Sequence, residues 1–196
     1  MGTKTLFLLR HAKAITGGID LADQDRPLSE SGLKDASKLS NKLHKKGAHF
    51  DLIVTSPAIR AITTAQIIIN HLNMKGSNFL IDPLLYEADS TTLLEYISRA
   101  SKKYDELMIV GHNPGLIDLA SHLAGEAVAM PTCALMKVTF GFKDWSKVTT
   151  EKSTKFSFIN YWLIGIEVTL LKYQIVMNQA YSERMSFIAI PRNFKA

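Results

Sequence analysis

The sequence has little of what marks secreted or nucleic-acid-binding proteins. Cys133 is the single cysteine in 196 residues, so no internal disulfide can form and a reducing compartment is expected. The net charge is only +5, and the lysines are scattered rather than gathered in a stripe, which argues against nucleic-acid binding. The N-terminus lacks the apolar core and small-residue cleavage site of a secretory signal. We therefore expect a cytoplasmic globular protein.

Long uncharged apolar runs are also scarce. One mostly apolar stretch, residues 161–177, contains Glu167 and Lys172, whereas a membrane-spanning helix needs roughly 20 largely uncharged residues. We expect this stretch to be a buried or oligomer-forming segment rather than a membrane span. The oligomeric state itself stays open.

Several kinds of catalytic site are missing as well. There is no GxxxxGK[ST] loop, so nucleotide binding of the P-loop type is not expected. A cysteine-nucleophile phosphatase needs an arginine six residues after the cysteine, but Thr139 stands there. Asp23 and Asp25 follow a polar stretch rather than the apolar strand that precedes an aspartate nucleophile. Histidines and carboxylates do not cluster at zinc spacing, so we expect no metal and no other cofactor.

What the sequence does contain is an alternation of strand-like and helix-like segments. This alternation predicts an α/β fold with three layers, in which helices flank a mostly parallel central sheet. Strands are predicted at residues 6–9, 51–55, 79–81, 107–110, 134–140 and 156–160. Helices are predicted from Ser29 to Gly47, from Ser56 and Pro57 to about residue 74, at 91–100, and from Asn113 to about residue 123.

The remaining segments complete the predicted organisation. Leu33 should lie on the apolar face of the first helix, because it shares helical spacing with the other aliphatic residues there. Residues 143–155 are polar and are predicted to form an exposed hairpin or loop. No linker is evident, so we expect one domain at residues 1–160, with residues 161–196 forming an extension packed on the same domain.

Cationic and imidazole side chains follow three of the predicted strands. Arg10 and His11 come after the first strand, Arg60 lies one turn into the helix after the second, and His112 follows the strand at residues 107–110. Ligands of open α/β sheets bind at the carboxyl ends of parallel strands. We therefore expect these four side chains to line one pocket.

Arg60 indicates the chemistry of that pocket. A cation in the first turn of a helix is mildly unfavourable, because the helix N-terminus already carries partial positive charge. A bound anion reverses this effect, and a guanidinium suits phosphate oxygens particularly well. A single histidine or arginine at a strand end is most often structural, but four of them at three strand ends favour an anion-binding catalytic pocket.

These residues and their neighbours resemble the histidine phosphatase superfamily, which has the phosphoglycerate-mutase-like fold. The matching motifs are Leu9-Arg10-His11, residues 26–32 (RPLSESG), Thr55-Ser56-Pro57 with Arg60, and residues 110–115 (VGHNPG). Their short spacing is similar to the bacterial SixA-type phosphohistidine phosphatases, and the match covers roughly residues 4–160. Two features depart from the family pattern: Ala12 stands where glycine is usual, and residues 161–196 match no part of the family.

The resemblance implies that His11 is the nucleophile that accepts the phosphoryl group. It also implies that Arg10, Arg60 and His112 hold the phosphoryl oxygens, which would make a metal ion unnecessary. Asn113, at the start of the next helix, is a further candidate for binding the substrate. Glu87 in Leu85-Tyr86-Glu87 matches the protonating acid of mutase-like relatives, although it could equally be a solvated loop carboxylate.

The leading hypothesis is a phosphohistidine protein phosphatase with a covalent intermediate on His11, acting on phosphorylated proteins of signalling or phosphotransfer systems. Residues 82–106 leave little room for a lid, and an open pocket would admit a phosphorylated side chain. One alternative is a broad-specificity phosphomonoesterase that acts on small phosphate esters. Another is an inactive phosphate-binding module whose apolar tail recruits a protein partner or a membrane.

Overall fold

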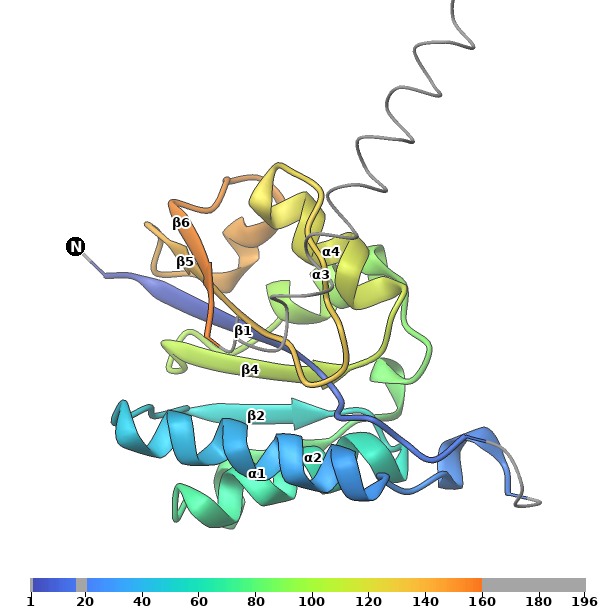
Figure 1. The fold of residues 1–196 in the computed structure, drawn as a ribbon. Helices are drawn as coiled ribbons and strands as arrows, with labels where there is room; N and C mark the ends of the chain where they lie inside the picture. Colours follow the sequence, from blue (N-terminus) through green and yellow to red (C-terminus); the bar gives the residue numbers. More distant parts are fainter. Residues whose placement is uncertain (1, 17–20, 160–196) are drawn as a thin grey trace, which may run out of the picture. The chain divides into compact units, whose positions relative to one another are not determined.

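The computed structural model describes residues 2–16 and 21–159, which form a six-stranded mixed sheet with helices on both faces (Figure 1). The strands are β1 (Lys4–Arg10), β2 (Leu52–Thr55), β3 (Phe79–Ile81), β4 (Glu106–Gly111), β5 (Leu135–Phe140) and β6 (Lys155–Phe158). Their order is β3-β2-β4-β1-β5-β6; the pairs from β3 to β1 are parallel, and β5 is antiparallel to both of its neighbours, β1 and β6. The predicted mostly parallel α/β sheet is confirmed.

The helices form the two outer layers. They are α1 (Glu30–Lys45), α2 (Ile59–His71), α3 (Ser90–Ser98) and α4 (Gly115–Ala124), with short 3-10 helices η1 (Asp23–Asp25), η2 (Gly76–Asn78), η3 (Pro83–Leu85) and η4 (Trp145–Thr149). Helices α1 and α2 pack on one face of the sheet, and α3 and α4 pack on the other. The predicted three-layer arrangement is therefore confirmed.

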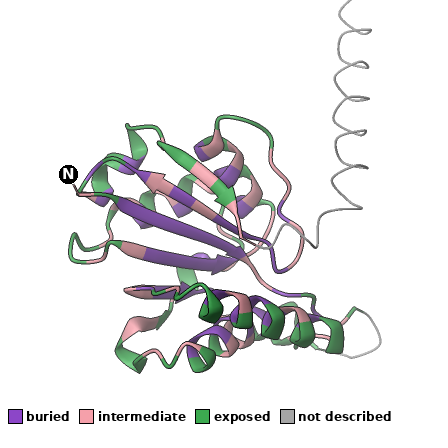
Figure 2. Cartoon of the chain, turned by 60° about the vertical axis from the view of Figure 1, so that its left-hand side comes forward, coloured by how far each residue is buried: buried purple, intermediate pink, exposed green. Residues whose placement is uncertain are grey.

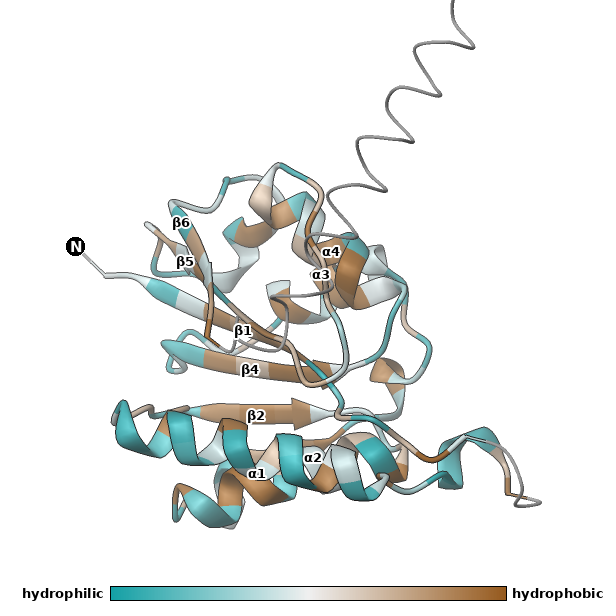
Figure 3. Cartoon of the chain, in the orientation of Figure 1, coloured by the Kyte–Doolittle hydropathy of each residue, from teal (hydrophilic) through white to brown (hydrophobic). Residues whose placement is uncertain are grey.

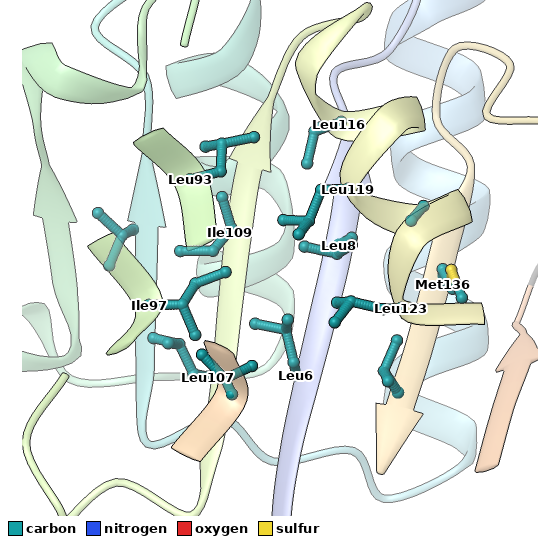
Figure 4. Packing of buried hydrophobic residues seen from close by; sticks show 14 of the residues in the cluster. Leu6, Leu8, Leu93, Ile97, Leu107, Ile109, Leu116, Leu119, Leu123 and Met136 are labelled. Carbon is teal, nitrogen blue, oxygen red and sulfur yellow. The ribbon is translucent and has the colours of Figure 1, made fainter. Parts of the chain in front are cut away.

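Strand β1 shows why its sequence reads as an unbroken apolar run. Leu6 and Leu8 pack into the cluster under α3 and α4, whereas Phe7 and Leu9 pack into the cluster under α1 and α2. Successive side chains of a strand point to opposite faces, so a strand covered on both faces needs apolar residues at every position. Figure 4 shows the α3 and α4 side of this packing around Leu6, Leu8 and Ile109.

Helix α1 covers the sheet with one face and meets solvent with the other. Its N-cap is the predicted Ser29, whose hydroxyl oxygen accepts a hydrogen bond from the Gly32 N–H at 3.1 Å. The outer surface of the helix is exposed and polar, while the central strands are buried along most of their length (Figures 2 and 3). Leu33 was predicted on the buried face but is 42% exposed, because it lies at the edge of the apolar stripe rather than within it.

Two other local predictions differ from the structure, and the second of them fails only at Trp145 and Val148. Helix α2 begins at Ile59 with Ala58 as N-cap, not at Ser56 and Pro57, because the Ser56 hydroxyl instead accepts a hydrogen bond from the Ala58 N–H and bonds to His112. Residues 143–155 were predicted to be exposed, yet η4 within them buries Trp145 completely. The indole N–H donates to the Tyr104 carbonyl at 2.8 Å, which satisfies its one polar group in the core.

The predicted extension at residues 161–196, including its apolar stretch at 161–177, lies outside the described residues. Its packing on the domain stays a prediction. Among the helices that the structure describes, none is long and apolar enough to cross a membrane.

Candidate active site

The carboxyl ends of β1, β2 and β4 lie side by side at one edge of the sheet. Strand β4 sits between the other two, with Gly111 opposite Arg10 of β1 and Val110 opposite Thr55 of β2. The segments that follow these strands therefore leave the sheet next to one another. The rings of His11 and His112 come within 5.0 Å, centroid to centroid, as the strand pattern predicted.

The main-chain carbonyl of the next residue, Ala12, fixes the tautomer of His11. Its Nδ1 lies 2.8 Å from the carbonyl oxygen of Ala12. Because a carbonyl oxygen only accepts hydrogen bonds, Nδ1 must carry the hydrogen, and in the neutral ring Nε2 then carries the lone pair. The pKa of His11 is lowered to about 4, mainly by burial; the charges of Arg60 and Arg10 act in the same direction, and the Ala12 hydrogen bond opposes them. At neutral pH the imidazole is therefore uncharged and able to act as a nucleophile.

The loop before β5 forms hydrogen bonds with the main chain of Arg10 and His11 and with the Arg10 side chain. The Cys133 N–H donates to the carbonyl oxygens of both Arg10 and His11, at 3.1 and 3.0 Å. The Met130 carbonyl accepts from Nη1 of Arg10 at 2.9 Å. Cys133 has a φ of 63°, in the left-handed region that is unusual for a residue with a side chain. Its thiol is fully buried, and burial raises its pKa to about 12, so it has no nucleophilic thiolate.

Arg60 projects from the first turn of α2 with a side chain that is only 6% exposed. Its Nη2 lies 3.5 Å from Nδ1 of His112. The same helix also reaches the nucleophile loop through Thr64, whose hydroxyl accepts from the Ala12 N–H at 3.1 Å and donates to the Arg60 carbonyl at 2.7 Å. Position and orientation of α2 are thereby tied to the backbone beside His11.

His112 is oriented by groups on both sides of its ring. A guanidinium cannot accept a hydrogen bond, so the nitrogen that faces Arg60 is the acceptor and Nε2 carries the hydrogen. That hydrogen is donated to the hydroxyl of Ser56 at 2.7 Å. Burial is the largest cause that lowers the pKa of His112 to about 3, followed by the charge of His11. The edge of the ring meets Tyr86, with centroids 5.6 Å apart.

The family of the chain follows from comparison with known proteins. The model of the histidine phosphatase superfamily (branch 1) matches residues 6–109. The chain belongs to the histidine phosphatase superfamily. An uncharacterised chloroplastic protein of Arabidopsis thaliana is 31% identical over 148 residues, which cover 71% of this chain and 68% of that protein.

Solved structures agree with this membership. SixA from Agrobacterium tumefaciens, described as a candidate phosphohistidine phosphatase, is 29% identical with a TM-score of 0.64, covering 69% of this chain and 90% of that one. The α-ribazole phosphatase from Shigella flexneri is 18% identical with a TM-score of 0.54, covering 71% and 92%; it shares the fold. The superfamily predicted from the motifs is confirmed, and membership supports a hydrolase of phosphoryl groups.

The remaining predicted site residues, Glu87 and Asn113, follow directly after two residues of the site, Tyr86 and His112. Glu87 is exposed and has a φ of 53°, whereas its neighbour Tyr86 contacts His112. Asn113 donates from Nδ2 to the Met130 carbonyl at 3.1 Å, and its Oδ1 is buried without a hydrogen-bond partner among the described residues. Within the same residues, no three His, Cys, Asp or Glu side chains are grouped so that they could hold a metal ion.

Sequence reasoning missed Asp23 and Tyr86. The Asp23 carboxylate bonds to Nη2 of Arg60 at 2.7 Å and to Nη2 of Arg26 at 2.6 Å, and it accepts from the Tyr86 hydroxyl at 2.9 Å. The three-residue spacing of Asp23 and Arg26 could have indicated their ion pair. No local signal points to Arg60, which lies 37 residues away in the sequence.

Proposed function

We propose that this member of the superfamily is a phosphohistidine protein phosphatase that transfers the phosphoryl group to His11. One observation carries the proposal. The imidazole of His11 is partly buried, its lowered pKa keeps it neutral, its Nδ1 hydrogen is bound by the Ala12 carbonyl, and arginine charges lie near it. Nε2 therefore has its lone pair available toward a group that the cations attract.

The proposed reaction has two displacements at phosphorus. In the first, Nε2 of His11 attacks, the bond from phosphorus to the substrate imidazole breaks, and the leaving imidazole takes up a proton. In the second, water attacks the phosphorylated His11, loses a proton, and displaces the His11 imidazole to give inorganic phosphate. We assign Arg10, Arg60 and His112 to the phosphoryl oxygens, because phosphoryl transfer depends mainly on alignment and on positive charge around the equatorial oxygens. The arginines supply that charge, and a bound phosphoryl group would favour a proton on Nδ1 of His112, which then donates to an oxygen. We assign Asn113 a secondary binding role, and we propose that these groups act without a metal ion.

Phosphohistidine is the proposed substrate because its leaving group needs little help. An imidazole has a pKa near ~6.5 and departs more readily than an alkoxide, so protonation by an acid matters less. This fits a site in which Glu87 is exposed. The segment between β3 and β4 consists mainly of η3 and α3, and it buries Leu85, Leu93 and Ile97 against the core. Because this segment packs against the core, we expect it to leave the pocket open enough for a phosphorylated side chain of a protein.

The test compares nitrogen-linked with oxygen-linked phosphate. Wild type, His11→Ala and Glu87→Gln are assayed on a phosphohistidine-bearing protein and on small esters such as sugar phosphates. We expect wild type to release phosphate fastest from phosphohistidine, Glu87→Gln to retain that activity, and His11→Ala to lose it. Faster ester hydrolysis that depends on Glu87 would instead favour the small-molecule phosphomonoesterase. Phosphate binding without turnover of either substrate would favour the inactive binding module.

A further inference from the structure

Asp23 binds the guanidinium of Arg60 through both its main-chain carbonyl and its carboxylate. The Asp23 main-chain carbonyl oxygen accepts from Nη1 of Arg60, and its carboxylate Oδ2 accepts from Nη2 at 2.7 Å. Both terminal nitrogens are therefore bound by the same residue. Since Arg60 is almost fully buried, this contact leaves the guanidinium little freedom to rotate.

The two hydrogen bonds to Asp23 leave other N–H groups of the Arg60 guanidinium available for a ligand. A guanidinium has an Nε–H and two hydrogens on each terminal nitrogen, and Asp23 takes one from each terminal nitrogen. Within the described residues, the buried Nε has no hydrogen-bond partner. Nη2 also faces Nδ1 of His112 at 3.5 Å. The buried Nε–H is thus a donor that no described group satisfies, and the long Nη2 contact connects Arg60 to the other side chain assigned to phosphate.

The charge balance around Asp23 stays positive. Its carboxylate is shared between Arg60 and Arg26, so one negative charge faces two positive ones. The hydrogen bond from Arg26 is the largest cause that holds the pKa of Asp23 far below its usual value, and the bonds from Arg60 and Tyr86 act in the same direction. Asp23 is thus ionised at neutral pH and is a poor proton donor. Its carboxylate offers only hydrogen-bond acceptors to its neighbours.

We propose that Asp23 is a positioning residue that holds Arg60 in the orientation needed to bind the phosphoryl oxygens. Tyr86 donates to the same oxygen Oδ2 at 2.9 Å, and Arg26 donates to the other oxygen Oδ1 at 2.6 Å. This inference rests on the proposed phosphoryl-binding role of Arg60. The opposite arrangement, in which Asp23 occupies the phosphate site and competes with substrate, makes the opposite prediction for binding.

Binding of inorganic phosphate, measured by calorimetry on the full chain, separates these arrangements. The variants are Asp23→Asn, Arg60→Lys and the double variant, with Asp25→Asn as the matched control because Asp25 is an exposed carboxylate of the same short helix η1. We expect Asp23→Asn to weaken phosphate binding about tenfold, the typical effect of losing a charged hydrogen bond. It should change binding much less when Arg60 is already lysine, and Asp25→Asn should bind like wild type.

Measurements on the same variants can also contradict the positioning role of Asp23. Phosphate binding that is unchanged or tighter in Asp23→Asn, or effects of Asp23→Asn and Arg60→Lys that simply add, would overturn the positioning role. Asp23→Glu keeps the charge and should recover most of the lost affinity, which a general loss of folding would not allow. If wild type binds phosphate normally but does not hydrolyse phosphohistidine, the proposed substrate is wrong and the role of Asp23 is still measured. If wild type binds no phosphate, both proposals fail.

Discussion

The folded domain should lose stability steeply as the pH falls from 7 to 5, because His11 and His112 are partly buried next to cations. Their pKa values are lowered from 6.5 to about 4 and about 3. Between pH 6.5 and these values the unfolded chain binds a proton at each histidine and the folded chain does not. Protonation therefore favours unfolding, and stability present at pH 7 is lost as the pH falls.

The size of this loss follows from the proton uptake of the unfolded chain. A pKa difference of one unit corresponds to ~1.4 kcal/mol. For a group that titrates at 6.5 when unfolded and stays neutral when folded, integration from pH 7 to pH 5 gives up to about 2 kcal/mol. The two histidines together should remove up to about 4 kcal/mol, a large part of the stability of an ordinary domain.

Urea denaturation at several pH values measures this loss. In His112→Gln the loss between pH 7 and pH 5 should fall to about half of the wild-type loss, because one of the two histidines with a lowered pKa is removed. The control is His122→Gln, which removes an exposed histidine from α4 and should keep the full loss. A His112→Gln variant that loses as much stability as wild type would refute the reasoning.

Two further variants and one control test the packing at the start of β1 and at the start of α4. Lys4 is 1% exposed, and its ammonium binds two main-chain carbonyls and Asp105, so Lys4→Met should destabilise the domain by about 2 kcal/mol in urea denaturation; an unchanged midpoint would contradict this. A Cβ on Gly115 would lie 1.9 Å from the Ala88 carbonyl oxygen, whereas one on Gly76 would meet nothing within 4 Å. Gly115→Ala should therefore lower the melting temperature and Gly76→Ala should not; equal effects of the two would count against the described contact.

The sequence allowed prediction of the sheet and of the site residues at its edge, because both depend on local pattern. The strand ends carry Arg10-His11 and His112, and parallel strands bring such ends together. The contact between Asp23 and Arg60 could not be predicted, because it depends on the path of the chain before α1. That path is fixed by tertiary bonds, such as the one from Nη1 of Arg26 to the Ile15 carbonyl.

Burial of isolated apolar residues was equally hard to predict. Trp145 stands in a polar segment, and its burial depends on the Tyr104 carbonyl and the Lys4 side chain, which come from distant parts of the chain. The start of α2 was misjudged because the Ser56 hydroxyl, a good helix cap in isolation, is instead engaged by His112. In both cases a tertiary contact outweighed the local preference.

Trapping the phosphorylated enzyme tests the central claim most directly. Wild type is quenched during turnover of a phosphohistidine-bearing protein, and the site of phosphorylation is located by peptide mass spectrometry and NMR. The account predicts a phosphoryl group on His11, and on Nε2 specifically, because the Ala12 carbonyl binds the hydrogen of Nδ1. A phosphoryl group on Nδ1 of His11, on another residue, or on no residue of an active enzyme would contradict it.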